Sequence, residues 1–186
     1  MALPVKVAMN TSCAALFLLL ARPLGGSADP TIWQDVKPDS IVVRAPRRII
    51  PRTYRTVCLD FVALRQLLAK APMEFTVAAK KSAVVLALPM PNGTWARFRM
   101  QESPISAPDP SGKMSDFKTY SGQGIDDRTS TLRCDVSQAG FHAQILFGGD
   151  SVYLDPFAPG DTAHCISYYK RDLPPRVRPE SRPSGK

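Results

Sequence analysis

Residues 118–172 read KTYSGQGIDDRTSTLRCDVSQAGFHAQILFGGDSVYLDPFAPGDTAHCISYYKRD, and they alternate apolar with polar side chains between short glycine-rich links. Successive side chains of a strand point to opposite faces, so this alternation predicts a half-buried antiparallel sheet. We expect strands at 117–120, 129–136, 141–147, 152–154 and 165–169. The links at 121–124, 138–140 and 148–150 are expected to be turns.

The segment before this stretch combines a β-like run with a helical pattern. Residues 47–59 are rich in apolar and β-branched side chains, and Pro51 confines this run to a sheet edge or a bulge. Asp60 is a suitable N-cap, and the apolar residues that follow recur at spacings of three and four: Phe61, Leu64, Leu67 and Leu68. We therefore predict an α+β fold, a mainly antiparallel β-sheet with one principal α-helix packed on it.

Two further strand-like runs, 82–88 and 94–100, flank Pro91-Asn92-Gly93. Asn-Gly is typical of a tight hairpin turn, because such turns require positive φ angles. Asn92-Gly93-Thr94 is also an N-glycosylation sequon. We favour the turn, rather than glycosylation, as the explanation for Asn-Gly at this position. The following segment, 102–115, is rich in Pro, Ser and Gly and has the length of a functional or mobile loop.

The N-terminus has the pattern of a secretory signal. Lys6 precedes an apolar run at 14–21, and small residues then lead to a cleavage site between Ala28 and Asp29. The apolar run is well short of the ~20 residues that a membrane-spanning helix needs. We expect an exported protein without a stable membrane span, located outside the cell or in the envelope or periplasm, whether translation starts at Met1 or Met9.

These patterns divide the chain into four parts. Residues 1–28 are the predicted signal peptide, and 29–46 an extended lead-in that lies across the body of the domain. Residues 47–172 are the predicted α+β domain. Residues 173–186 are rich in Pro and Arg, which predicts a disordered tail. A linker-like tail at this point leads us to expect a truncated or orphaned gene product.

The formal charge of +8 does not indicate nucleic-acid binding. Residues 29–169 carry 16 basic and 14 acidic residues, so most of the excess lies at the two ends. An arginine cluster at 44–55 has Tyr54 as its one aromatic neighbour, whereas single-stranded nucleic acids are bound on series of aromatic side chains. We interpret the basic residues as a solvated face and expect no nucleic-acid partner.

Three cysteines remain after removal of the signal with Cys13: Cys58, Cys134 and Cys165. A disulfide between Cys134 and Cys165, if these lie on neighbouring strands, is one alternative in an oxidising compartment. Small buried thiols are the interpretation that we favour. The spacing does not fit zinc ligation.

The chain offers few groups for chemistry. A zinc peptidase needs His-Glu-x-x-His on a helix, and neither His142 nor His164 is in such a motif. We expect His142 to be exposed or hydrogen bonded on a strand, and His164 to contact Asp161 in a local turn. The acidic pairs Asp126 with Asp127 and Asp155 with Asp161 lack the spacing of a calcium loop or a glycosidase site. We therefore expect no catalytic residue, no metal and no cofactor.

Several blocks, in this order, resemble the non-catalytic N-terminal domain of bacterial secreted reprolysin-like zinc metallopeptidases. The similarity covers about residues 47–172. The blocks are Tyr54-Arg55-Thr56 with Leu59-Asp60, Ala71-Pro72-Met73-Glu74, Ala87-Leu88-Pro89-Met90-Pro91-Asn92-Gly93, Glu102-Ser103-Pro104-Ile105, Lys118-Thr119-Tyr120-Ser121-Gly122-Gln123-Gly124-Ile125-Asp126-Asp127, Gly140-Phe141-His142-Ala143, Val152-Tyr153-Leu154-Asp155-Pro156 and Ile166-Ser167-Tyr168-Tyr169-Lys170-Arg171-Asp172.

The resemblance implies a propeptide-like module that assists folding of a peptidase or keeps it latent. The catalytic domain with its zinc motif is absent from this chain, so the resemblance transfers no catalytic or metal residue. The expected partner is a metallopeptidase catalytic domain, bound through the 102–115 loop or the segment from Lys170 onward. The alternative is a free-standing adhesion or ligand-binding β module of the cell envelope.

Overall fold

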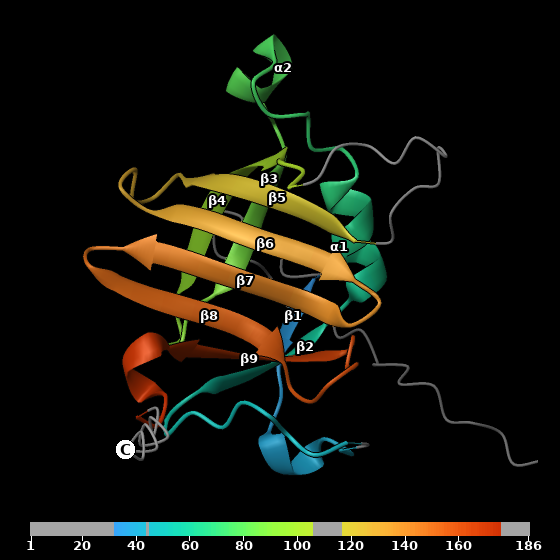
Figure 1. Cartoon of the computed structure of the whole chain (residues 1–186), viewed down its shortest axis with the longest axis vertical. Coiled ribbons are helices and arrows are strands. Elements are labelled where there is room, and N and C mark those ends of the chain that lie inside the picture. Colours follow the sequence, from blue (N-terminus) through green and yellow to red (C-terminus); the bar gives the residue numbers. More distant parts are fainter. Residues whose placement is uncertain (1–31, 44, 106–116, 176–186) are drawn as a thin grey trace, which may run out of the picture.

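The computed structural model describes residues 32–43, 45–105 and 117–175. Within them, nine strands form one sheet in the order β1-β2-β9-β8-β7-β6-β5-β4-β3, and every neighbouring pair is antiparallel (Figure 1). The strands are β1 (Trp33–Asp35), β2 (Arg55–Leu59), β3 (Val85–Pro89), β4 (Trp95–Glu102), β5 (Lys118–Gly124), β6 (Thr131–Ser137), β7 (Gly140–Phe147), β8 (Asp150–Pro156) and β9 (His164–Tyr169).

The mainly antiparallel sheet that the sequence predicts is confirmed. The helical part is small and consists of α1 (Phe61–Leu68), α2 (Val77–Lys80) and the 3-10 turns η1 (Pro38–Ser40) and η2 (Lys170–Asp172). Asp60 caps α1 as predicted, since its Oδ1 accepts a hydrogen bond from the backbone N–H of Ala63 at 2.9 Å. The spacing of three and four then turns Leu64 and Leu68 inward, where both are fully buried.

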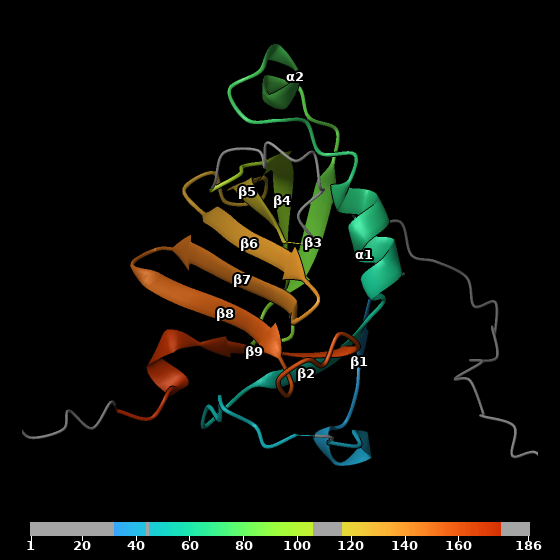
Figure 2. The same ribbon diagram turned by 45° about the vertical axis from the view of Figure 1, so that its right-hand side comes forward.

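The sheet curls around one apolar core, so that β3 and β4 lie across from β6, β7 and β8 (Figure 1, Figure 2). Leu64 and Leu68 of α1 belong to this core. The rings of Trp33 in β1 and Phe141 in β7 lie 5.7 Å apart, although three strands separate β1 from β7 in the sheet order. Such a contact requires a strongly twisted and curved sheet.

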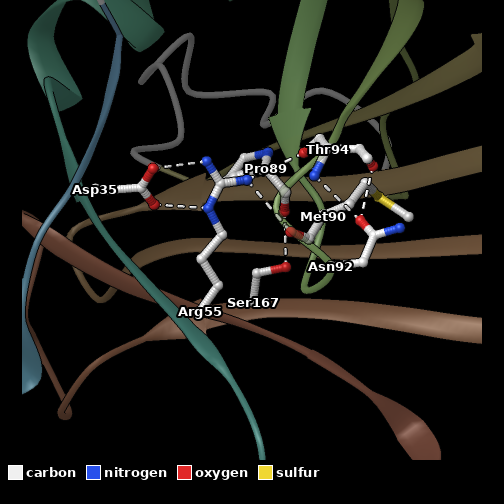
Figure 3. Close-up of polar contacts among 7 residues, drawn as sticks. All are labelled: Asp35, Arg55, Pro89, Met90, Asn92, Thr94 and Ser167. Atoms are coloured by element: carbon white, nitrogen blue, oxygen red, sulfur yellow. Dashed lines mark hydrogen bonds and ion pairs between the residues drawn. The ribbon is translucent and has the colours of Figure 1, made fainter.

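Polar contacts join parts of the sheet that are far apart in its order. The Ser167 hydroxyl on β9 donates to the carbonyl oxygen of Pro89 at the end of β3, at 2.7 Å. Arg55 on β2 binds the Asp35 carboxylate and also donates to the carbonyl oxygens of Met90 and Thr94 (Figure 3). These contacts hold the β3–β4 hairpin against β2 and β9.

One predicted turn is wrong. Ser121–Gly124 is the second half of β5 and not a link between strands. A Cβ atom on Gly122 would lie 2.9 Å from Met100 Sδ and 3.0 Å from Phe98 Cβ, so this strand passes too close to β4 for a side chain. The glycines reflect close packing between strands, and the turn comes after them, where Asp127 binds Thr129.

The predicted hairpin at Asn92-Gly93 is confirmed, but its turn differs from the expected one. Gly93 has a positive φ of 86°, whereas Asn92 is not among the residues with positive φ. The Asn92 side chain accepts hydrogen bonds from the backbone N–H and the hydroxyl of Thr94, at 3.2 and 2.7 Å. Asn92 therefore stabilises the turn through its side chain.

Within the predicted extended lead-in, Trp33–Asp35 is an edge strand paired with β2. Trp33 is 4% exposed, and Ile41 joins a second apolar cluster with Phe157, Ile166 and Tyr168. The predicted signal peptide, most of the 102–115 loop and the tail from 176 lie outside the described residues. Among the helices of the described part, none has the length and apolar character needed to cross a bilayer.

Candidate binding groove on the outer face of the sheet

The face of the sheet opposite the main core carries a polar array on β6, β7 and β8. Period two places Leu132 and Cys134 in the core and turns the side chains between them outward. The register aligns the array in two rows: Asp135 pairs with His142, while Arg133 pairs with Gln144 and Gln144 with Tyr153. The array comprises Arg133, Asp135, His142, Gln144, Tyr153 and Asp155.

The array lines a groove of about 540 Å³. Its wall on the β5 side includes Ser103 and Thr119, and its wall on the β8 side includes Tyr153 and Asp155. A second hollow of about 200 Å³ adjoins it and shares His142 and Asp155. We call the two hollows together the outer groove.

His142 is held by a carboxylate at the centre of the outer groove. Its Nδ1 lies 3.1 Å from Asp135 Oδ2, and its side chain is 38% exposed. The hydrogen bond with Asp135 raises the pKa of His142, burial opposes this, and the charges of Asp135 and Asp155 raise it further. Folding therefore raises the affinity of the His142 ring for a proton relative to the unfolded chain.

Asp155 interacts with Tyr168 on β9. The Tyr168 hydroxyl donates to Asp155 Oδ2 at 2.6 Å. Burial raises the pKa of Asp155, while the hydrogen bond from Tyr168 and the nearby His142 oppose this rise. Burial also raises the pKa of Tyr168, and the bond to Asp155 adds to that rise. The pair keeps the Tyr168 proton in place and offers the remaining lone pairs of the carboxylate to the groove.

Hydrogen-bonding groups of several kinds line the rest of the groove. Arg133 Nη1 donates to Ser103 Oγ at 2.7 Å, and Gln144 Nε2 donates to the Tyr153 hydroxyl at 3.1 Å. The Tyr153 ring stacks on Tyr168 with centroids 5.8 Å apart. Arginine and histidine donate, carboxylates accept, and the tyrosine ring provides an apolar surface. The groove therefore offers hydrogen-bonding groups together with exposed apolar surface.

The cysteine alternative is resolved by the strand order. Cys134 lies on β6 and Cys165 on β9, and β7 and β8 separate these strands, so the two residues are not on neighbouring strands. Both are buried free thiols, and burial raises the pKa of each. The disulfide between Cys134 and Cys165 is therefore not formed. The predicted cleavage site at Ala28 and Asp29 lies outside the described residues.

The remaining sequence candidates have local partners. Asp161 accepts hydrogen bonds from the backbone N–H groups of Ala163 and His164 and contacts the His164 ring at 3.1 Å, which confirms the predicted turn contact. Asp126 pairs with Arg97, and Asp127 caps a turn. Across residues 32–43, 45–105 and 117–175, no three His, Cys, Asp or Glu side chains converge into a metal-binding group.

The sequence patterns identified His142 as a hydrogen-bonded strand residue, and this is confirmed. They did not single out Arg133, Asp135 or Gln144. A signal was present, because polar residues at alternate positions on both sides of the 138–140 link must share one face of a hairpin. The contact of Tyr168 with Asp155 could not be predicted in this way, because a longer connection joins β8 to β9.

No protein-family model, no curated protein and no solved structure matches this chain. Several of the blocks that carry the resemblance to the metallopeptidase N-terminal domain contribute residues to the outer groove. The Gly140–Ala143 block and the Val152–Pro156 block contribute His142, Tyr153 and Asp155 to the outer groove. The block from Lys118 contributes Thr119 and Tyr120.

The His142–Asp135 contact predicts a pH-dependent stability. The pKa of His142 is raised above its ordinary value of 6.5, so its stabilising contribution is complete below that value and is lost as pH rises through the folded-state pKa. We expect the difference in unfolding free energy between wild type and Asp135→Asn to be largest below the ordinary pKa of histidine and to shrink as pH rises above it. Urea unfolding at several pH values measures it, and a pH-independent difference would contradict the contact.

Proposed function

We propose that this chain is a secreted, non-catalytic module that binds the catalytic domain of a metallopeptidase, either to assist its folding or to keep it latent. The observation that carries the proposal is the outer groove, a concavity lined by both polar and apolar groups on a sheet face that α1 does not cover. In this proposal the module is an α+β domain, and α1 is its one principal helix.

The groove has the composition of a non-obligate protein interface. Such interfaces are about as polar as the rest of a protein surface, and arginine and tyrosine contribute most to their affinity. Arg133 and Tyr153 lie in the same row of the groove, with Gln144 between them. An extended segment of the partner would find donors and acceptors along its whole length.

The test is binding of the purified chain to a reprolysin-like peptidase catalytic domain by calorimetry, together with inhibition of its hydrolysis of casein. We expect Arg133→Glu to weaken binding at least about tenfold, because it reverses the charge at the centre of an interface. Arg99→Glu is the matched control, since Arg99 is an exposed arginine on β4 outside the groove. If both variants bind as tightly as wild type, the groove is not the interface. If the wild-type chain does not bind the peptidase domain, the peptidase is not its partner.

The second candidate is a ligand-binding module of the cell envelope. It is favoured by Tyr153, whose ring lies in the groove beside Gln144 and Asp155, because an aromatic surface next to amide and carboxylate groups also suits sugar hydroxyls. Affinity for envelope polysaccharide that Arg133→Glu or Tyr153→Ala abolishes, without affinity for the peptidase, would select this function.

A further inference from the structure

The segment between α1 and β3 projects from the body of the molecule, with α2 at its far end (Figure 1, Figure 2). Three apolar side chains on it are solvent exposed: Met73 at 46%, Phe75 at 96% and Val77 at 77%. Isolated exposed apolar residues are ordinary, but three of them within five residues of a projecting turn form an apolar tip. We call residues 73–81 the apolar tip.

Phe75 is held in a conformation that costs free energy. Its φ is 63°, which makes it the one non-glycine residue with a positive φ among the described residues. For a bulky side chain this is uncommon, and strained residues of this type occur at functional positions. A phenylalanine that is both strained and exposed does not stabilise the fold.

The apolar tip is nevertheless well defined. The backbone N–H of Glu74 donates to the carbonyl oxygen of Glu102 at 2.8 Å, and the N–H of Glu102 donates to that of Pro72 at 2.9 Å. The Thr76 hydroxyl donates to the Met73 carbonyl and accepts from the N–H of Ala79. These bonds fix the turn to the end of β4 and leave the Phe75 side chain in solvent.

Exposed lysines precede the apolar tip in the chain and form its end. Lys70, Lys80 and Lys81 are all exposed, and Glu74 is the one acidic residue between positions 70 and 81. Because α2 has four residues, its length is only about 6 Å, so Lys80 and Lys81 lie close to Phe75. The charge near the tip is therefore positive and complementary to an anionic surface.

We propose that the apolar tip docks the protein on an anionic lipid surface, with Phe75 and Val77 inserted at the boundary of headgroups and acyl chains and the lysines on lipid phosphates. An apolar end with a basic border is the composition of interfacial membrane anchors. A protein partner is less favoured, because the tip is convex and Thr76 uses its hydroxyl within its own turn. This inference does not depend on the proposed function.

Sedimentation of the full chain with vesicles tests the proposal. We expect binding to vesicles of equal parts phosphatidylcholine and phosphatidylglycerol, and much weaker binding to phosphatidylcholine alone. Phe75→Gly should reduce binding at least about tenfold through the lost apolar side chain, and Lys80→Gln about fivefold. Glycine adopts a positive φ without strain, so Phe75→Gly should fold at least as stably as wild type.

Val42→Ser is the matched control, since Val42 is 85% exposed and follows η1, at the opposite end of the molecule from α2 (Figure 1). A tryptophan placed at position 75 supplies a second measurement, because brominated lipids in the anionic vesicles should quench Phe75→Trp and not Val42→Trp. Three results would each overturn the proposal: Phe75→Gly binds anionic vesicles as tightly as wild type, the tryptophan at position 75 is not quenched, or the wild-type chain does not bind anionic vesicles. Loss of peptidase binding in Phe75→Gly without vesicle binding would assign the tip to a protein partner instead.

Discussion

Replacing Arg55 by alanine is expected to lower the free energy of unfolding by about 3 kcal/mol, because one guanidinium connects three parts of the sheet. Its Nε and Nη2 donate to the Asp35 carboxylate on β1 at 2.6 and 2.9 Å. Its Nη1 donates to the carbonyl oxygens of Met90 and Thr94 at 3.3 and 3.0 Å (Figure 3). The guanidinium carbon also lies 4.7 Å from the ring centroid of Trp95.

The effect is expected to come from the hairpin contacts rather than from the ion pair. The Arg55 side chain is 10% exposed, whereas that of Asp35 is 65% exposed and stays solvated when its partner is removed. Asp35→Asn should therefore cost at most about 1 kcal/mol. Arg55→Lys should lie between the two, because an ammonium group cannot reproduce the fork of donors.

Equilibrium urea unfolding of the three variants, followed by circular dichroism, makes the comparison. An Arg55→Ala variant that is no less stable than Asp35→Asn would show that the carbonyl contacts do not hold the β3–β4 hairpin against β2. A loss confined to β1, seen as fast amide exchange there alone, would lead to the same conclusion.

Sequence patterns could not predict the contacts of Arg55. They did predict β2, β3 and β4, which these contacts connect, but they did not predict β1. Alternation and helical spacing depend on residues close together in the chain, so they predicted the α1 segment, the hairpins and the buried face of β6 and β7. The bonds from Arg55 to Met90 and Thr94 span 35 and 39 residues. Nothing local to either segment indicates that the sheet curls and brings them together.

The glycines of β5 illustrate the same limit. Ser121–Gly124 has the composition of a turn, and local rules assign it to one. What requires Gly122 is the approach of Phe98 and Met100 from β4. The outer groove could be predicted in part. The 138–140 link predicts the pairing of Asp135 with His142. The contact of Asp155 with Tyr168 could not be predicted, because it depends on how β9 returns beside β8.

The strand order also explains why the thiol interpretation holds and the alternative of a disulfide between Cys134 and Cys165 fails. Cys134 lies on β6, and successive hairpins add β7 and β8 beside it. The next strand in the sheet, β9, carries Cys165, so two strands separate the thiols. Cys165 instead lies opposite Val57 on β2. The strands expected at 141–147 and 152–154 already lie between the two thiols in the chain, so a simple succession of hairpins keeps Cys134 and Cys165 apart.

Phe141→Ala is expected to cost about 4 kcal/mol, because it removes a fully buried ring and leaves a cavity in the middle of the core. Phe141 lies at the start of β7, and its ring is tilted by 57° against that of Trp33. Trp33→Phe, in contrast, should change stability little, since the Trp33 N–H is buried without a hydrogen-bond partner in the described part of the chain.

A double-mutant cycle of Phe141→Ala and Trp33→Ala separates the ring contact from the cavity. We expect a coupling free energy of about 1 kcal/mol, the usual value for an aromatic pair. β1 has three residues and pairs with β2 alone, so the Trp33 ring is what attaches this edge strand to the core. Zero coupling in urea unfolding would mean that β1 is held by its backbone hydrogen bonds to β2 and not by Phe141.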